Sequence, residues 1–198
     1  KEMKVIKTDS RWIDTVYPWD LISVNSEAMR DVVKSVNGVI EEDVIIKGPV
    51  RIREGATIKG GSYIEGPAII GEGSEIGPHA CIFPSTSIGE DSKIGPFTVI
   101  QNSILMQTVQ VGPNSNIEDS VLGEGVKIGS NFSSYVGEAK KITDDKIQNI
   151  ERIGCMIAGD TMIGSGVVTE PGVVIGNRCR VDSGKNIRRD TPSESRVV

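Results

Sequence analysis

Few residue types in this chain could do chemistry. It has one histidine, His79, in the stretch Ile76-Gly-Pro-His79-Ala80. Histidine is the side chain that most often serves as a general base near neutral pH, so His79 is a candidate catalytic residue, and simple exposure to solvent is the alternative for it. The three cysteines, Cys81, Cys155 and Cys179, are odd in number and lack metal-site spacing. We interpret Cys179 as a buried thiol.

An isoleucine returns every six residues between residues 40 and 100. A period of six is a multiple of the strand period of two and fits the helical period of 3.6 poorly, so these side chains share one side of extended strands. A small or β-branched residue follows each isoleucine by four places, and glycine often follows it directly. The repeat predicts an all-β fold, a parallel β-helix in which three hexads form one coil of a triangular prism. A β-sandwich is the alternative, and it would leave the repeat unexplained. The ladder residues are Ile40, Ile46, Ile52, Ile58, Ile64, Ile70, Ile76, Ile82, Ile88, Ile94 and Ile100.

The composition agrees with a narrow solenoid. Aromatic residues make up 4% of the 198 residues, and a narrow prism has little room for rings. The net charge of −5, with no basic stripe, argues against a nucleic-acid partner. Because neither a signal peptide nor a long apolar run stands out, we predict a cytoplasmic protein without a membrane partner.

Residues 1–38 precede the ladder. Lys4-Val5-Ile6-Lys7 reads as a strand whose partner is not in the chain, so we expect the chain to be part of a longer protein. Residues 18–36 carry apolar side chains at helical spacing, and Asn37-Gly38 is a common helix stop. We predict one amphipathic helix that covers the open first coil as a cap.

The ladder becomes irregular after Ile100. Two sides of the prism, Ile100 to Leu105 and Ile117 to Leu122, are one residue short, and such irregularities often lie where a fold is adapted for a site or a subunit contact. Residues 131–152 lose the ladder and carry many charges, so we predict an excursion inserted into one solenoid. The predicted solenoid spans 39–190, and 191–198 are a loose tail.

The region before the ladder resembles a known enzyme segment. Trp12-Ile13-Asp14 followed by Pro18-Trp19-Asp20-Leu21 is similar to the W-x-D-x-G-x-P-W-D-L segment that closes the catalytic domain of sugar-1-phosphate nucleotidylyltransferases, just before a hexapeptide-repeat tail. Val16 replaces the glycine of that family. The resemblance implies that Asp14 helps to hold the catalytic Mg²⁺ in the parent enzyme, together with an aspartate that this chain lacks. A turn or capping role is the alternative for Asp14.

The ladder itself resembles the left-handed β-helix acyltransferases, which implies a left-handed β-helix. Residues 94–181 are most similar to the acetyltransferase half of bifunctional sugar-1-phosphate enzymes. In that family a histidine acts as the general base on the acceptor amine, and a tyrosine and an asparagine orient the sugar phosphate. The matching positions here are Pro113, Asn116 and Val136. Proline and asparagine cannot act as bases near neutral pH, so the central group of that mechanism is missing.

Two further positions follow from this resemblance. Phe83 stands where the family has a phosphate-binding arginine. Ile163-Gly164-Ser165 matches a serine-bearing turn that contacts the thioester of acetyl-CoA, so Ser165 is a candidate coenzyme A ligand, and an ordinary hexad is the alternative. The γ-type carbonic anhydrases share the fold but need three histidines around zinc, and one histidine cannot build that site.

Three functions stay open at this point. The one we favour is a module for assembly, the hexapeptide tail of a sugar-1-phosphate nucleotidylyltransferase that acts on a sugar phosphate or sugar nucleotide. The resemblance implies a homotrimer with parallel prisms, in which the excursion lies over a neighbouring subunit. The second function is an acetyl-CoA-dependent N-acetyltransferase for an amino-sugar 1-phosphate, with a different base. The third is a regulatory domain that binds coenzyme A or a sugar nucleotide.

Overall fold

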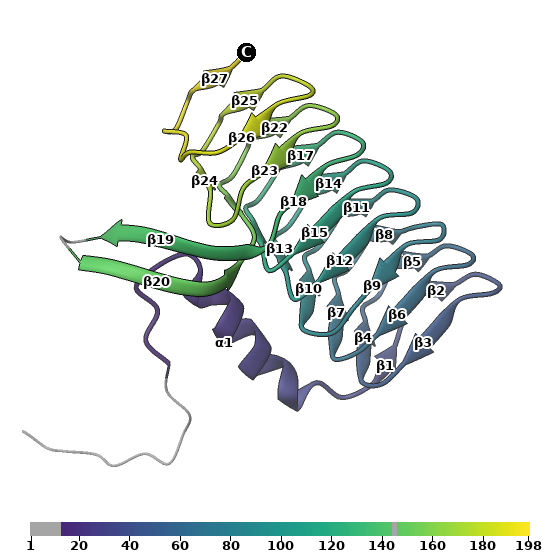
Figure 1. The fold of residues 1–198 in the computed structure, drawn as a ribbon. Coiled ribbons are helices and arrows are strands. Elements are labelled where there is room, and N and C mark those ends of the chain that lie inside the picture. The colour runs from purple at the N-terminus through teal and green to yellow at the C-terminus, as the bar shows by residue number, and fades with distance from the viewer. Residues whose placement is uncertain (1–12, 144–145) are drawn as a thin grey trace, which may run out of the picture.

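The chain forms a three-sided prism of parallel strands. The computed structural model describes residues 13–143 and 146–198. Each coil gives one strand to each side (Figure 1). Ile52, Ile70 and Ile88 therefore stack directly on one another. The parallel β-helix predicted from the six-residue period is confirmed.

The three sides are parallel sheets, which we call sheets A, B and C. Sheet A consists of β1 (Ser35–Val36), β4 (Val50–Ile52), β7 (Ala68–Ile70), β10 (Thr86–Ile88), β13 (Ile104–Leu105), β16 (Val121–Leu122), β21 (Met156–Ile157) and β24 (Val174–Ile175). Sheet B consists of β2 (Val39–Ile40), β5 (Thr57–Ile58), β8 (Glu75–Ile76), β11 (Lys93–Ile94), β14 (Gln110–Val111), β17 (Lys127–Ile128), β22 (Met162–Ile163), β25 (Arg180–Val181) and β27 (Arg196–Val197). Sheet C consists of β3 (Ile45–Lys47), β6 (Tyr63–Glu65), β9 (Cys81–Ile82), β12 (Val99–Gln101), β15 (Asn116–Glu118), β18 (Ser133–Ser134), β23 (Val168–Thr169) and β26 (Asn186–Ile187).

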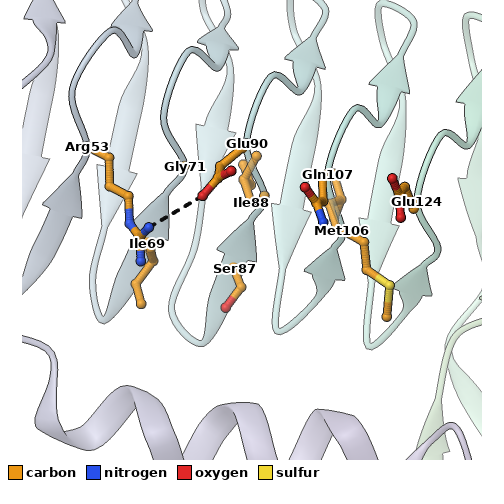
Figure 2. A pocket seen from close by; sticks show the side chains of 11 residues that line it. Arg53, Ile69, Gly71, Ser87, Ile88, Glu90, Met106, Gln107 and Glu124 are labelled. Carbon is orange, nitrogen blue, oxygen red and sulfur yellow. Dashed lines mark ion pairs between the residues drawn. The ribbon is translucent and has the colours of Figure 1, made fainter.

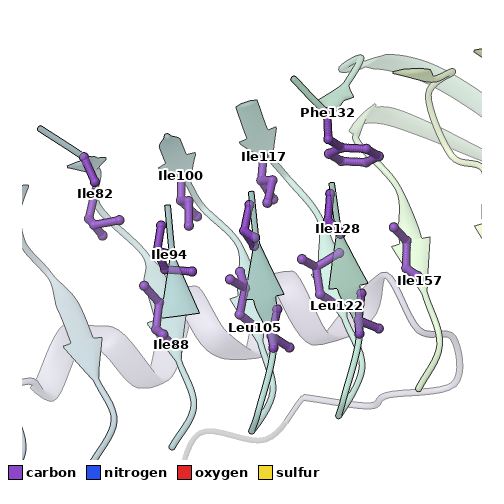
Figure 3. Packing of buried hydrophobic residues seen from close by; sticks show 14 of the residues in the cluster. Ile82, Ile88, Ile94, Ile100, Leu105, Ile117, Leu122, Ile128, Phe132 and Ile157 are labelled. Carbon is purple, nitrogen blue, oxygen red and sulfur yellow. The ribbon is translucent and has the colours of Figure 1, made fainter. Parts of the chain in front are cut away.

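The ladder side chains fill the interior, as Figure 3 shows for the middle coils. From Ile52 to Ile100 every ladder isoleucine is at most 2% exposed, and Ile40 and Ile46 of the first coil are partly buried. Leu105, Leu122 and Ile157 continue the ladder in sheet A. Burial of one such side chain stabilises the fold by about 1.5–3 kcal/mol.

The corners of the prism depend on left-handed backbone. Gly61 has φ +70°, and the stacked corners place His79 at +54°, Phe97 at +57° and Asn114 at +55°. Glycine and asparagine adopt this conformation readily, whereas it is a genuine outlier for a bulky side chain. Phe97 therefore occupies a corner conformation that its residue type disfavours.

The predicted helix is shorter than expected and lies elsewhere. The segment forms α1 (Asp20–Ala28) and a 3-10 turn, η1 (Met29–Asp31), and Val36 belongs to β1, which pairs with β4. The apolar side of α1 packs on the outer face of sheet A, against β10 and β13, and not on the open first coil. The helix is therefore not an end cap, because its apolar partners are outward residues of sheet A. α1 is too short to span a bilayer, and the described chain holds no longer helix.

The excursion is a β-hairpin, β19 (Gly137–Thr143) and β20 (Lys146–Ile153), at the corner between sheets C and A. It starts later than the predicted residue 131, because Ser133 still pairs with Asn116 and Val168 in sheet C and Phe132 is buried in the core. The ladder then resumes in register, with Leu122 paired to Ile157. The strands before and after the hairpin thus belong to one solenoid.

Two further predictions concern the ends of the chain. The predicted strand at residues 4–7 lies outside the described residues. At the C-terminus, Arg196 and Val197 pair with Arg180 and Val181, so this segment continues sheet B and is not a loose tail.

Candidate functional site

The positions matched to the acetyl-transfer site lie on sheet C and on its edge with sheet B. Pro113 is at the corner between β14 and β15, and Asn116 points outward from β15. Phe83 follows β9, two coils before Asn116, and Val136 lies between β18 and the hairpin. Neither Pro113 nor Asn116 offers a group that titrates near neutral pH.

Ser165 is exposed at the same sheet B to sheet C edge, two coils after Pro113. Its hydroxyl accepts a hydrogen bond of 3.2 Å from the Ser130 backbone N–H, and its own N–H donates to the Ser183 hydroxyl at 3.1 Å. The serines of three successive coils therefore form a ladder of hydrogen bonds along the edge. The Ser165 hydroxyl still has its own hydrogen to donate, so its chemistry fits a contact with a thioester carbonyl.

His79 is exposed at the same edge but far from Ser165. Its imidazole stacks on the Phe97 ring, with 5.2 Å between the ring centroids and 10° between the planes. Strands β8 and β22, which precede the two corners, are four coils apart in sheet B. At about 4.8 Å per coil the separation is about 19 Å, too long for one substrate amine to meet both residues within a single chain.

The outer face of sheet C carries an apolar and aromatic patch. We call it the sheet C patch; its members are Ile45, Tyr63, Cys81, Phe83 and Val99, which lie in adjacent strands. The Tyr63 and Phe83 rings are 6.0 Å apart, and the Lys47 ammonium lies 5.3 Å from the Tyr63 centroid. Ile45 is 52% exposed, and Phe97 at the neighbouring corner is 58% exposed.

Part of the outer face of sheet A is covered instead. A second small core joins Trp19, Leu21 and Ile22 of the helical segment to the buried Val121, Ile153 and Met156. Ile153 is the last residue of the hairpin, so helix and hairpin share one apolar contact on this sheet. The described helix and hairpin thus cover part of sheet A, and the sheet C patch lies on another side of the prism.

The two short sides of the prism anchor the hairpin. Their corners are Asn102 and Asp119, and the Asn102 amide donates to the Asp119 carboxylate. Nε of Arg152, on β20, lies 2.7 Å from Oδ2 of Asp119, whose side chain is 5% exposed, and Arg152 also pairs with Glu118. The predicted adaptation at these sides is therefore an anchor for the inserted hairpin.

A groove of about 370 Å³ runs along sheet A beside α1 (Figure 2). Arg53 and Glu90 face each other in it, with Nη1 3.5 Å from Oε1. Met106, which is 39% exposed, and Ile69 supply apolar surface, and Glu124 adds a second carboxylate. The two carboxylates make this groove unsuitable for a phosphorylated ligand.

The described residues do not form a metal site by themselves. Asp14 is exposed in the segment before α1, and no group of three histidine, cysteine or acidic side chains within 13–143 and 146–198 could hold a metal ion. The nearby Asp20 carboxylate, in the first turn of α1, accepts the N–H groups of Val16 and Tyr17, which precede the helix, at 2.9 and 2.8 Å. The role of Asp14 as an Mg²⁺ ligand in a parent enzyme stays a prediction.

Comparison with known proteins finds two family models that match parts of the chain. Residues 64–148 match the family described as the GMPPB C-terminal domain, and residues 157–187 match the hexapeptide repeat of succinyl-transferase. The first match covers 85 of the 198 residues, fewer than half of the chain, and the second shows that the last coils carry hexapeptide repeats. The predicted kinship with the C-terminal part of bifunctional nucleotidylyltransferase/acetyltransferases is confirmed.

Individual relatives of this hexapeptide-repeat domain match over short segments. The bifunctional sugar-1-phosphate nucleotidylyltransferase/acetyltransferase of Sulfurisphaera tokodaii is 46% identical over 63 residues, 31% of this chain and 16% of that protein. The bifunctional protein GlmU of Methanococcus maripaludis is 41% identical over 54 residues, 27% of this chain and 13% of that protein. The aligned part is thus less than a fifth of either relative's length.

Solved structures give a weaker likeness. A hexapeptide transferase family protein from Anaplasma phagocytophilum has a TM-score of 0.45 at 15% identity, covering 75% of this chain and 77% of that one. PerB from Caulobacter crescentus, solved with CoA and GDP-perosamine, has a TM-score of 0.30 at 19% identity, covering 87% and 58%.

The thiols of the hexapeptide-repeat domain differ in exposure. Cys155 and Cys179 are buried, which confirms the interpretation of Cys179, whereas Cys81 is partly exposed in the sheet C patch. Burial raises the pKa of the Cys155 thiol above its ordinary value of 9.0, because the apolar interior disfavours the thiolate. Cys155 and Cys179 are therefore structural, inert thiols.

Sequence reasoning missed the sheet C patch. Its residues stand one place before, or one place after, the ladder isoleucines, at Tyr63, Cys81, Phe83 and Val99. These places point outward by the strand period of two. Reading the outward places as rows, coil by coil, would have shown the apolar patch.

Proposed function

We propose that this chain is the assembly module of a cytoplasmic sugar-1-phosphate nucleotidylyltransferase, and that the sheet C patch joins it to further copies of itself in a trimer. The observation that carries the proposal is the patch itself. Three of the eight aromatic residues of the chain, Tyr63, Phe83 and Phe97, gather on this one open side. Contiguous exposed apolar surface with aromatic side chains is typical of protein interfaces.

Phe97 supports this proposal in a second way. It is held in left-handed backbone, which costs about 1–3 kcal/mol for a residue of this kind, and its ring is more than half exposed. The left-handed backbone forms the corner of the prism, and a residue such as asparagine would form the same corner at a lower cost. Burial of the Phe97 ring against a partner chain would offset both costs.

The residues do not support acetyl transfer by the mechanism of the bifunctional relatives. General-base catalysis contributes about 10²- to 10⁴-fold in rate, and the base position is Pro113. His79 is about four coils, or about 19 Å, from Ser165 and cannot replace the base there within one chain. We propose that the acetyltransferase-like part serves assembly and not catalysis.

The alternative function, an acetyl-CoA-dependent N-acetyltransferase, is favoured by one observation. The exposed Ser165 lies next to a groove of about 480 Å³ that contains Gly164, Ser183, Arg180 and Arg196. Arginine side chains are good partners for phosphate groups such as those of coenzyme A.

Light scattering over a range of protein concentrations tests the assembly proposal. We expect a trimer, and we expect Ile45→Lys combined with Phe97→Asn to dissociate it, because the lysine charge and the lost ring remove apolar contact while asparagine tolerates the left-handed corner. Met162→Lys is the matched control, since Met162 is 43% exposed on sheet B. Cys81 should react with a thiol reagent more slowly in the trimer than in the dissociated variant. A monomer at every concentration would refute the proposal.

An activity assay separates the alternative. With acetyl-CoA and glucosamine 1-phosphate or galactosamine 1-phosphate, we expect no thiol release above background and no effect of His79→Ala. Thiol release at about one turnover per second or more, abolished by His79→Ala, would establish the enzyme instead.

A further inference from the structure

A third groove, of about 570 Å³, lies between the hairpin and the last coils of the prism. Strand β19 forms one wall, and the sheet C to sheet A corners after β23 and β26 form the other. Cavities of this size are typical of small-molecule sites. The lining residues are Glu138, Ala139, Lys140, Lys141, Ile142, Pro171, Val173, Arg188, Arg189 and Asp190.

The groove is basic although the chain as a whole carries a net charge of −5. Four basic side chains, Lys140, Lys141, Arg188 and Arg189, line it against the two acids Glu138 and Asp190. A local excess of positive charge on an acidic protein attracts anions specifically to that place.

Asp190 does not neutralise the arginines. Its Oδ1 accepts the Lys141 ammonium at 2.6 Å and the Val174 backbone N–H at 2.9 Å. The Lys141 side chain is only 15% exposed, so this ion pair is part of the groove's structure. Within the part of the chain that the structure describes, Arg188, Arg189 and Lys140 have no ion pair with an acidic side chain, and all three are exposed.

Apolar surface lies beside these free cations. Pro171 contributes from the coil, and Ile142, which is 77% exposed, contributes from the hairpin. A ligand with phosphates at one end and a flat ring or a chain at the other would match both parts of the groove.

We propose that this groove binds a nucleotide that carries two linked phosphates, with Arg188, Arg189 and Lys140 holding the phosphate oxygens. Arginine forks and a lysine ammonium give charge-assisted hydrogen bonds to phosphate, and Arg188 and Arg189 are adjacent in sequence at one corner. Coenzyme A and nucleoside diphosphates share this chemistry. The inference goes beyond the assembly function and does not depend on it.

Calorimetric titration of the whole chain at low ionic strength tests the proposal, with inorganic pyrophosphate, ADP, GDP and coenzyme A as probes. We expect at least one nucleotide to bind, and we expect Arg188→Gln combined with Arg189→Gln to weaken it by about tenfold or more. Binding should also weaken as salt is added, because the contacts are exposed charges.

The matched control is Lys93→Gln combined with Lys127→Gln, which removes the same charge from exposed positions on sheet B. This control should bind normally. Lys140→Gln provides a second variant on the hairpin side, and thermal unfolding without ligand shows that each variant is folded. Tighter binding of coenzyme A than of ADP would identify an acyl carrier, and tighter binding of GDP would identify a guanine nucleotide.

Three outcomes would overturn the proposal. The first is no binding of any probe at low salt. The second is equal binding by the Arg188→Gln, Arg189→Gln variant and the unchanged chain. The third is equal loss of binding in the Lys93→Gln, Lys127→Gln control, since that result would show attraction by the overall charge and not a site.

Discussion

The interior ladder makes a quantitative prediction at Ile70. The side chain is fully buried and lies in register between Ile52 and Ile88, so truncation to alanine leaves a void with isoleucine on both sides and no chain end that could close it. Such a truncation costs about 2–5 kcal/mol, the sum of lost burial and a cavity that cannot collapse. Ile70→Asp should fail to fold, because an unpaired charge in that interior costs far more.

Urea denaturation followed by circular dichroism measures the loss, and two isoleucines elsewhere provide matched controls. Ile142→Ala, on the hairpin, should change the free energy of unfolding by less than about 0.5 kcal/mol, since that side chain is 77% exposed. Ile46→Ala, in the partly buried first coil, should fall between the two. Because coils contact only their neighbours, hydrogen exchange in Ile70→Ala should accelerate mainly in the adjacent coils. A loss below about 1 kcal/mol at Ile70, or normal stability of Ile70→Asp, would refute the packed ladder.

Two further predictions concern Cys155 and Arg152. Burial raises the pKa of the Cys155 thiol above its ordinary value of 9.0. Above pH 9 the folded state therefore keeps a proton that the unfolded chain loses. The contribution of this thiol to the free energy of unfolding is complete below pH 9 and is lost as the pH rises towards the folded pKa. Cys155→Ala should therefore show a shallower fall in the free energy of unfolding above pH 9, by up to about 1.4 kcal/mol per pH unit, and equal slopes would contradict the assignment. Arg152→Met leaves the 5% exposed Asp119 carboxylate without its cation and should cost about 1–3 kcal/mol and speed proteolysis of the hairpin. The control is Arg178→Met, which breaks an ion pair with Glu194 in which both side chains are exposed, and it should cost less than about 0.5 kcal/mol. Combining Arg152→Met with Asp119→Asn should recover stability. Equal losses for Arg152→Met and Arg178→Met would count against the anchor.

The interior of the prism was predictable because one physical rule determines it. A six-residue period allows only extended strands with one buried side chain per side, and the register in sheets A, B and C follows that period even through the short sides at Leu105 and Leu122. Return of the ladder after the hairpin was predictable for the same reason, since Ile157 must stack on Leu122 to close the core.

The position of α1 was not predictable from its own sequence. An amphipathic pattern indicates that a helix packs on an apolar surface, but it does not identify that surface. The open coil end and the outer face of sheet A were both possible partners. The partner surface is formed by Ile104, Val121 and Met156, outward residues of three different coils. These residues become neighbours only when the coils stack.

The start of the hairpin was missed because Phe132 is large where the repeat has a small residue, and Ser134 is small where the repeat has a large one. Phe132 fills a small-residue corner place and Ser134 stands at a ladder place, yet both are buried. The Ser134 hydroxyl accepts the Glu118 backbone N–H at 2.9 Å, so the core tolerates a polar side chain there. The large Phe132 at the corner fills the space that the small Ser134 leaves in the ladder. A search for the six-residue repeat that tests each position separately rejects both residues.

The features that point to function all lie at outward and corner places, where the ladder imposes no residue type. The sheet C patch occupies outward places in consecutive coils, and the basic groove uses the corner that holds Arg188 and Arg189. The two short sides belong to the same design, because Asn102 and Asp119 hold Arg152 and thereby fix the hairpin whose strand β19 forms the groove wall. The hairpin packs on sheet A and lines the basic groove, whereas the sheet C patch lies on another side of the prism, so the proposed phosphate site and the proposed interface use different surfaces.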